Sequence, residues 1–352
     1  MKKKIFVVII SLGVLILNSC NSNPVGPPII LEIQPGRRDY VWTEDTLKVP
    51  KGELAELSFL WGSGPDDIWA IASASSLSQL GIWHYVGNNW KNFIDNPTYT
   101  FAQTSIWGVA SNDIWLGNGD GIIWRYDGKV WNNFTRLQVN RYQNFGIQRL
   151  WGISANEIYA VGVAYNSYFN EGQLGGIFMY DGTKWKQVEL PKLYLNFFQL
   201  RKAKNGDFII PAFKGSIDST KLIVWNGKEF RVLFSDVGFS SFNVFNIGET
   251  TLFNIAKVVY SYENDGSYKK WKDFSSTDYY GPILCSRSEK DFFVGSWALQ
   301  GINHYNGTDL KLIYSAPNTR IGGGLIFEKD VFFTLLDLNT NNTRILHGHL
   351  QN

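Results

Sequence analysis

The phrase Trp61-Gly62 … Asp67-Ile68-Trp69 … His84-Tyr85 … Trp90 decides the fold, because the chain goes on to repeat it. Nearly literal copies read Trp107-Gly108 … Asp113-Ile114-Trp115 … Arg125-Tyr126-Asp127-Gly128 … Trp131 and Trp151-Gly152 … Glu157-Ile158-Tyr159 … Tyr180-Asp181-Gly182 … Trp185. A period of about 45 residues that is rich in aromatic residues and glycine turns is typical of a β-propeller, in which each repeat forms one four-stranded blade. The repeat predicts an architecture, whereas the activity has to be inferred from individual sites.

The number of blades follows from the residue that precedes the second strand of each repeat. This position falls at Asp67, Asp113, Glu157, Asp207, Thr251 (a degenerate match), Asp291 and Asp330. A third strand runs into an Asp-Gly or Asn-Gly turn in four repeats, and a fourth strand opens on an aromatic residue in five. Asp-Gly and Asn-Gly supply the positive φ that tight hairpins need. The chain is therefore predicted to be an all-β, seven-bladed β-propeller with four-stranded antiparallel blades.

The seventh repeat lacks a fourth strand. After Gly348 only four residues remain, whereas the segment from Asp39 to Pro50 resembles a fourth strand and has no repeat of its own. We predict that this N-terminal strand closes the last blade, because joining the two ends covers an edge that would otherwise be open. Six or eight blades would require one repeat to be miscounted.

At Trp-Gly-x-x-x-x-Asp-Ile-Trp and Tyr-Asp-Gly-x-x-Trp the chain resembles a family of bacterial secreted propellers. These proteins are related to kelch-like and Asp-box propellers, are often lipoproteins, and are in some cases loosely labelled as glucosyltransferases. The resemblance covers nearly all of residues 40 to 350, and it weakens in the last four repeats, where Trp-Gly is lost. Such motifs determine blade geometry and carry no chemistry, so the resemblance implies a fold and leaves the activity open.

Residues 1–19 are predicted to be a lipoprotein signal peptide. Three lysines precede an apolar stretch from Ile5 to Leu17, which is too short to cross a bilayer comfortably as a helix. Leu17-Asn18-Ser19-Cys20 then resembles the lipobox of bacterial lipoproteins, which implies that Cys20 becomes the first mature residue and carries the lipid. Acyl chains on Cys20 would hold the protein at a membrane surface.

Residues 20–36 are predicted to be a flexible linker, and residues 37–352 the propeller. The linker holds four prolines and no Lys or Arg. Asn21 is not the aspartate that tends to retain enterobacterial lipoproteins at the inner membrane. The resemblance therefore favours a cell-envelope protein of the outer membrane, and it leaves open whether the domain faces the periplasm or the outside.

Charge and cysteine content exclude several classes of function. The whole chain has 33 basic and 31 acidic residues, and removing residues 1–19 takes away three lysines and no acid. A nearly neutral domain lacks the basic field of a typical nucleic-acid binder. With Cys20 lipidated, Cys285 stands alone in an apolar strand, where a packed thiol is expected and no intramolecular disulfide can form.

None of the four histidines is predicted to bind a metal. His84 and His304 take the same position before the third-strand tyrosine, where other blades carry Arg, Met and Val. His347 and His349 alternate on the last strand, but no third Cys or His lies nearby in sequence, and zinc sites need three or four ligands.

Catalytic residues and cofactors are not predicted either. The acids beside the turns recur blade after blade, which hairpin chemistry explains and an active site does not. The segment Asn264–Trp271 is a poor version of the Asp-box, a turn motif that in sialidase propellers lies away from the active site. A sialidase would also need an arginine triad, for which Arg149, Arg201 and Arg287 are available although nothing in the sequence brings them together.

The connections that break the repeat are the best candidates for a binding surface. In a propeller, the connections from second to third strands and from blade to blade gather at one face around the channel mouth. Tyrosine rings beside Asn, Asp and Arg can stack on sugars or anchor a protein partner, or they can pack the loops onto the blades. The predicted ligand-binding residues are Arg141, Tyr142, Tyr165, Tyr168, Tyr194, Asp278, Tyr279 and Tyr280.

Three functions remain open from the sequence. The first is a lipid-anchored, non-catalytic binding module for a glycan or an envelope protein. The second is a glycan-active enzyme, sialidase-like or glycosidase-like, which requires two carboxylates roughly 5–10 Å apart at the channel mouth. The third is a scaffold that assembles other envelope proteins.

Overall fold

The structure is a computed structural model that describes residues 34–49, 55–72, 81–93, 103–166, 172–214, 219–237, 242–277, 281–296, 298 and 300–352. Its contacts separate the segment Met1–Ile33 from one compact unit, Gln34–Asn352. The signal peptide and most of the linker predicted from the sequence, with Cys20, lie outside the described residues. In the described part of the chain there is no helix of the length and hydropathy required to span a membrane.

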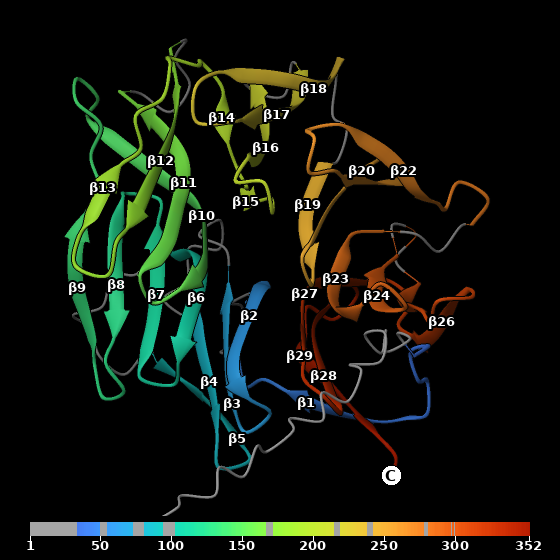
Figure 1. Cartoon of the computed structure of the whole chain (residues 1–352). Coiled ribbons are helices and arrows are strands. Elements are labelled where there is room, and N and C mark those ends of the chain that lie inside the picture. The colour runs from blue at the N-terminus through green and yellow to red at the C-terminus, as the bar shows by residue number, and fades with distance from the viewer. Residues whose placement is uncertain are drawn as a thin grey trace, which may run out of the picture. The chain divides into compact units, whose positions relative to one another are not determined.

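Gln34–Asn352 folds into seven antiparallel sheets, which we number as blades in chain order (Figure 1). Blades 1 to 3 contain β2 (Leu57–Gly64), β3 (Asp67–Ala72), β4 (Ile82–Val86) and β5 (Asn89–Asn92); β6 (Gln103–Ala110), β7 (Asp113–Asn118), β8 (Ile122–Tyr126) and β9 (Trp131–Arg136); and β10 (Asn144–Ser154), β11 (Glu157–Tyr165), β12 (Leu174–Tyr180) and β13 (Trp185–Gln187). Blades 4 and 5 contain β14 (Asn196–Phe197), β15 (Arg201–Lys202), β16 (Phe208–Lys214), β17 (Ser219–Trp225) and β18 (Phe230–Val237); and β19 (Phe242–Ile247), β20 (Thr250–Ile255), β21 (Val258–Tyr262) and β22 (Tyr268–Asp273). Blades 6 and 7 contain β23 (Ile283–Ser288), β24 (Asp291–Gly295), β25 (Gly301–Tyr305) and β26 (Leu310–Ser315); and β27 (Thr319–Ile326), β28 (Asp330–Asp337), β29 (Thr343–Leu350) and β1 (Tyr40–Thr46).

The seven-bladed propeller predicted from the repeat is confirmed, with four strands in six blades. In blade 4 the first strand is interrupted, so that β14 and β15 both pair with β16. The first strand of each blade faces the centre of the ring, and the chain passes from blue β2 through green and yellow to red β29 around it (Figure 1).

The core of the domain lies between the blades. Seven clusters of buried apolar side chains are present among the described residues, and each is shared by two consecutive blades. The cluster around Phe332 and Ile68 joins blade 7 to blade 1. Because every blade has a packed neighbour on both sides, the ring is closed.

The closure by the N-terminal strand is also confirmed. β1 pairs with β29 along its whole length, from Tyr40 opposite Leu350 to Thr46 opposite Arg344. Tyr40 packs in the cluster between blades 6 and 7, and Leu47 in the cluster between blades 7 and 1. The first described strand therefore completes the last blade and contributes to both of its interfaces.

The tryptophan and the glycine of the Trp-Gly motif form a contact between neighbouring blades. The Trp61 indole donates a hydrogen bond to the Gly108 carbonyl at 3.1 Å, and a Cβ added to Gly108 would lie 2.5 Å from the Trp61 ring. Trp107 lies on Gly152 in the same way, at 2.6 Å from an added Cβ. An indole of one blade thus covers the glycine of the next, which explains why tryptophan and glycine recur together.

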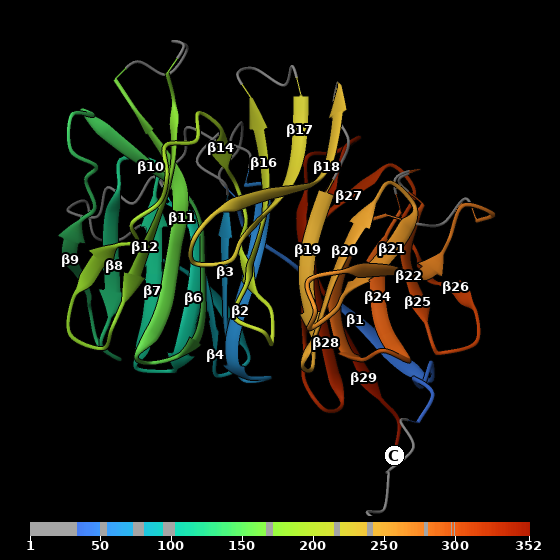
Figure 2. The same cartoon turned by 45° about the horizontal axis from the view of Figure 1, so that its top comes forward.

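The two ends of the ring carry different connections. The turns from first to second and from third to fourth strands lie at one end, here called the turn end. At this end the Asp127 carboxylate accepts hydrogen bonds from the Lys129 and Val130 amides at 2.9 Å, and Gly128 has φ +93°. The connections from second to third strands and from blade to blade lie at the other end, called the loop end. The strands run from one end to the other in Figure 2.

Candidate ligand site in the central channel

A repeated irregularity in the first strands controls what faces the centre of the ring. In blades 1 to 3 the register between first and second strand shifts at the same point, for instance between Ile147 and Arg149 in blade 3, and blades 6 and 7 carry a shift elsewhere in the first half of the same strand pair. Such bulges re-aim a side chain. The residue after the shift, two before the tryptophan, is Phe59 in blade 1, Ser105 in blade 2 and Arg149 in blade 3.

In blade 4 an arginine replaces the tryptophan itself. Ile209, two residues after the acid of the repeat, pairs with Arg201, just as Trp69 pairs with Trp61 in blade 1. Arg201 therefore occupies the tryptophan position. Its guanidinium lies over the ring of Trp151 at 5.4 Å, and Lys202 stands where blades 1 to 3 carry the glycine.

Arg149 and Arg201 line a cavity of about 480 Å³ that residues of all seven first strands enclose. Its remaining described lining is aromatic, aliphatic, amide-bearing or hydroxyl-bearing and holds no Asp or Glu; its rings are Phe59, Trp61, Trp107, Trp151 and Phe245. Cys285 also contributes to this lining, and burial raises the pKa of its thiol, as expected for a packed cysteine.

Neither arginine has a carboxylate partner among the described residues. The Arg149 guanidinium lies over the Phe59 ring at 4.1 Å, and its Nε is buried without a hydrogen-bond acceptor. Arg201 donates one hydrogen bond, to the Leu200 carbonyl at 2.7 Å. Burial lowers the pKa of Arg149 to about 10, and burial together with the charge of Arg149 lowers the pKa of Arg201 to about 9. Both remain protonated at neutral pH, and they lie close enough to repel each other.

The third arginine of the triad considered from the sequence is elsewhere. Arg287 donates hydrogen bonds to the Tyr40 hydroxyl at 2.8 Å, the Asp291 carboxylate at 3.0 Å and the Phe327 carbonyl at 2.7 Å. It therefore stabilises the contact of blades 6 and 7, and the triad is not assembled. The described lining of the cavity includes no Asp or Glu.

Four of the predicted loop residues can be placed, all at the loop end. Arg141 and Tyr142 precede β10, Tyr165 ends β11, and Tyr194 precedes β14. Arg141 is exposed with φ +72°, and Tyr194 is 53% exposed. Tyr168, Asp278, Tyr279 and Tyr280 lie outside the described residues.

The tyrosines at the loop end differ in how far they are available. Tyr165 is 7% exposed and donates a hydrogen bond to the Gly119 carbonyl at 3.3 Å. Tyr142 donates one to the Gly172 carbonyl at 3.2 Å, and burial with the neighbouring Tyr194 raises its pKa. These two rings contact the connections, so among the described loop-end tyrosines of the prediction Tyr194 is the most exposed.

The histidines belong to a second repeated motif, at the turn end. The acid that begins the second strand binds a basic side chain of the next strand, as in Asp67–His84 at 2.6 Å and Asp291–His304 at 2.8 Å. The histidine rings stack on the aromatic residue two places after the acid, with centroids 3.9 Å apart for Trp69 and His84. The prediction that His84 and His304 are structural agrees with these contacts.

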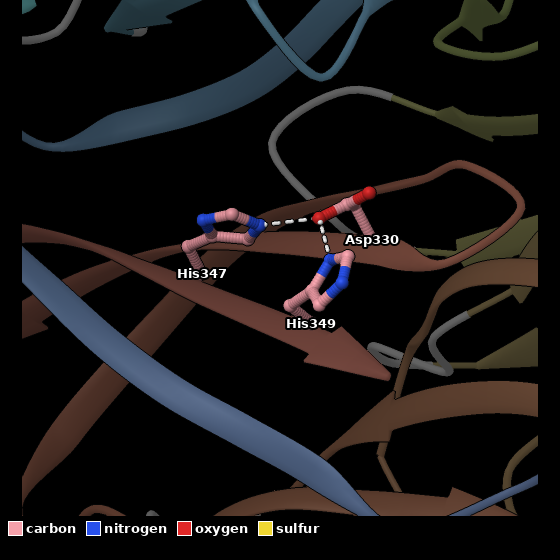
Figure 3. A group of neighbouring side chains, drawn as sticks. All are labelled: Asp330, His347 and His349. Carbon is pink, nitrogen blue, oxygen red and sulfur yellow. Dashed lines mark hydrogen bonds and ion pairs between the residues drawn. The ribbon is translucent and has the colours of Figure 1, made fainter. Parts of the chain in front are cut away.

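In blade 7 this pair has a third member (Figure 3). His347 Nε2 and His349 Nδ1 both contact Asp330 Oδ1, at 2.7 and 2.8 Å, and their possible ligand atoms lie within 4.8 Å of one another. Asp330, which strand pairing places opposite His349, is too distant in sequence to have been considered beside the two histidines. Tetrahedral zinc holds its ligand atoms roughly 3.3 Å apart. The group is therefore arranged as a hydrogen-bonded extension of the repeated acid–base pair.

Comparison with known proteins adds the fold and no activity. Neither the family models nor the curated proteins gave a match, so the resemblance inferred from the repeats stays a prediction. Among solved structures, YCF48 bound to a D1 peptide is similar with a TM-score of 0.57 at 11% identity, over 91% of this chain and 100% of that chain. A streptogramin B lyase is similar with a TM-score of 0.60 at 13% identity, over 87% of this chain and 97% of that chain. The Neurospora crassa Pan2 WD40 domain is similar with a TM-score of 0.57 at 11% identity, over 91% of this chain and 98% of that chain. At such identities the likeness shows that the chain is a β-propeller like these proteins.

Proposed function

We propose that the chain is a lipid-anchored, non-catalytic binding module of the cell envelope, and that it binds a protein partner at the loop end of the ring. The observation that carries this proposal is the chemistry of the channel cavity. Its described lining combines two cations with aromatic rings and amides and has no carboxylate for acid–base work. Such a lining can hold a ligand but has no described group to hydrolyse one.

A protein partner is preferred over a glycan because of the loop-end tyrosines. Sugars stack on open ring faces, and of the described loop tyrosines only Tyr194 is mostly exposed. Propellers of the same fold are found in complex with a peptide, as YCF48 with a D1 peptide, and with a protein, as BBS1N with ARL6DN. These complexes support the choice by analogy of fold alone.

Site-specific photocrosslinking in cells tests the binding face. A photoreactive phenylalanine at Tyr194 is expected to capture an envelope protein, because this side chain is 53% exposed at the loop end. The matched control is the same residue at Val130, which is 47% exposed at the turn end. Equal capture from both positions, or capture from Val130 alone, would contradict the assignment of the face. A partner that joins several other proteins would favour the scaffold role.

Anchoring is tested separately. Cys20→Ala is expected to move the protein from the membrane fraction to the soluble fraction, because no lipid can then be attached. Unchanged membrane association of this variant would refute the lipid anchor while leaving the binding face untouched.

A further inference from the structure

The two arginines of the channel form an arrangement that a structural role does not explain. Arg149 and Arg201 come from neighbouring blades and point into the same cavity, with no described carboxylate on its wall. Removing a cation from water without a counterion costs free energy, and placing a second cation beside it costs more. Neutral side chains occupy the same positions in neighbouring blades, Phe59 and Ser105 at that of Arg149 and Trp151 at that of Arg201, so blade geometry does not require either charge.

The contacts that the arginines do make leave their hydrogen-bonding edges available. The Arg149 guanidinium lies over the Phe59 ring and the Arg201 guanidinium over the Trp151 ring. This cation–π contact offsets part of the cost of burial, and it leaves the N–H groups in the plane of each guanidinium. Within the described residues Arg149 donates none of these N–H groups, and Arg201 donates one, to Leu200. The pair therefore presents several unused donors to one space.

We propose that the central cavity binds a carboxylate group, held by charge-assisted hydrogen bonds from Arg149 and Arg201, with the apolar part of the ligand against the surrounding rings. Planar guanidiniums match the two oxygens of a carboxylate. The volume of about 480 Å³ suits a small ligand or the end of a side chain or peptide. This inference rests on the proposed binding function for its natural ligand, which is either a small carboxylic acid or the acidic terminus of a protein partner.

Binding is measured by titration calorimetry on the full chain in detergent, with phenylacetate and its neutral analogue phenylacetamide as probes. Phenylacetate is expected to bind in the millimolar range, and phenylacetamide about tenfold more weakly or not at all, because only the charge differs. Arg149→Met and Arg201→Met should each weaken phenylacetate about tenfold, and the binding of phenylacetamide should not change. Equal affinity for the two probes, or no binding of phenylacetate at millimolar concentration, would overturn the proposal.

The melting temperature of the unliganded variants distinguishes a binding role of the two arginines from a structural role, because the two roles predict changes in opposite directions. Without ligand, Arg149→Met and Arg201→Met should melt at a higher temperature than the wild type, since each removes an unpaired charge from a partly buried position. A lower melting temperature in both variants would show that the arginines stabilise the ring, and the proposal would fall. Arg149→Lys keeps the charge without the planar fork, and is expected to bind phenylacetate with intermediate affinity.

The two sources of the carboxylate are separated by a peptide with a free C-terminal carboxylate and the same peptide amidated. Tighter binding of the free-acid peptide than of phenylacetate indicates a protein terminus, and equal or weaker binding indicates a small acid. Failure of this proposal is distinct from failure of the proposed function. Crosslinks from Tyr194 without any binding of the probe would retain the binding face and remove the carboxylate site.

Discussion

At the scale of single residues, one position of the repeat changes its chemistry between blades. Trp61 and Trp107 cover a glycine of the following blade, whereas Arg201 takes the same place in blade 4. The indole fills the space between two sheets, and the guanidinium brings an unneutralised charge to the channel. The candidate site therefore lies at a blade in which the Trp-Gly motif of the repeat is lost.

Gly108→Ala tests the packing of the Trp-Gly phrase. The added methyl would lie 2.5 Å from the Trp61 ring, which is rigid and packed, so the free energy of unfolding should fall by about 1–3 kcal/mol. Gly64→Ala is the matched control, because an added Cβ there meets nothing within 4 Å. Urea denaturation of both variants checks the prediction, and equal stability of the two would contradict the proposed contact.

His304→Gln tests the pH dependence of stability. Burial lowers the pKa of His304 below its ordinary value of 6.5, against the opposing effect of the Asp291 carboxylate. As pH falls below about 6.5 the unfolded chain takes up a proton that the folded chain takes up only at lower pH, so the free energy of unfolding should decrease from pH 7 to pH 5. The variant should be less stable at pH 7 and show a flatter dependence over this range. Urea denaturation at both pH values measures it; an unchanged slope would show that another group is responsible.

At the scale of elements, β1 does the work of a whole fourth strand although it lies at the opposite end of the sequence. Its seven residues pair in register with β29, and Tyr40 and Leu47 fill the interfaces on both sides of blade 7. Sequence counting could predict this pairing because the seventh repeat was one strand short. It could not predict that the first strand of blade 4 is split into β14 and β15, because no residue of the repeated motif indicates the interruption.

Deletion of residues 37–50 tests the closure. The loss of Tyr40, Trp42 and Leu47 from the interfaces of blade 7 should lower the free energy of unfolding by about 3–6 kcal/mol. A synthetic peptide of residues 34–49, added to the truncated chain, should restore part of this stability by pairing with β29. Thermal unfolding with and without the peptide measures both effects. Unchanged stability on deletion would refute the closure.

At the scale of the whole molecule, the seven interfaces form a circuit. Each blade depends on two neighbours, and the contact between blades 7 and 1 is of the same kind as the other six. The tryptophans are concentrated in blades 1 to 3, so their fluorescence reports mainly on that part of the ring, whereas circular dichroism reports on all the sheets.

The two signals should follow the same transition in the wild-type chain, because a closed ring unfolds as a unit. In the chain without residues 37–50 the circuit is open, and the two curves should separate as blades are lost from the free ends. Urea titration with both probes on the same samples checks this. Separate transitions in the intact protein would mean that the blades unfold independently.

The sequence predicted the fold but did not single out the channel cavity, for a physical reason. Blade geometry is determined by residues close together in sequence, namely the turn residues and the spaced aromatic residues of each repeat. The channel site depends on side chains from different blades that only the closed ring brings together, and on a bulge that re-aims Arg149. Loop composition predicted that Tyr194 lies at the loop end of the ring, where the structure has it, but composition could not show that Tyr165 is buried. Asp330 was counted as a blade marker, and its contact with His349 became visible only through strand pairing.

The pairing of β1 with β29 also orders events in time. Of the described strands of the propeller, β1 is synthesised first and its partner β29 last. Tyr40 can therefore pair with Leu350 only after nearly the entire propeller has been synthesised. Translation that stops early leaves blade 7 one strand short and its rim unsealed, whatever the quality of the blades already made. The closing pair of strands therefore forms only after all seven blades have been synthesised.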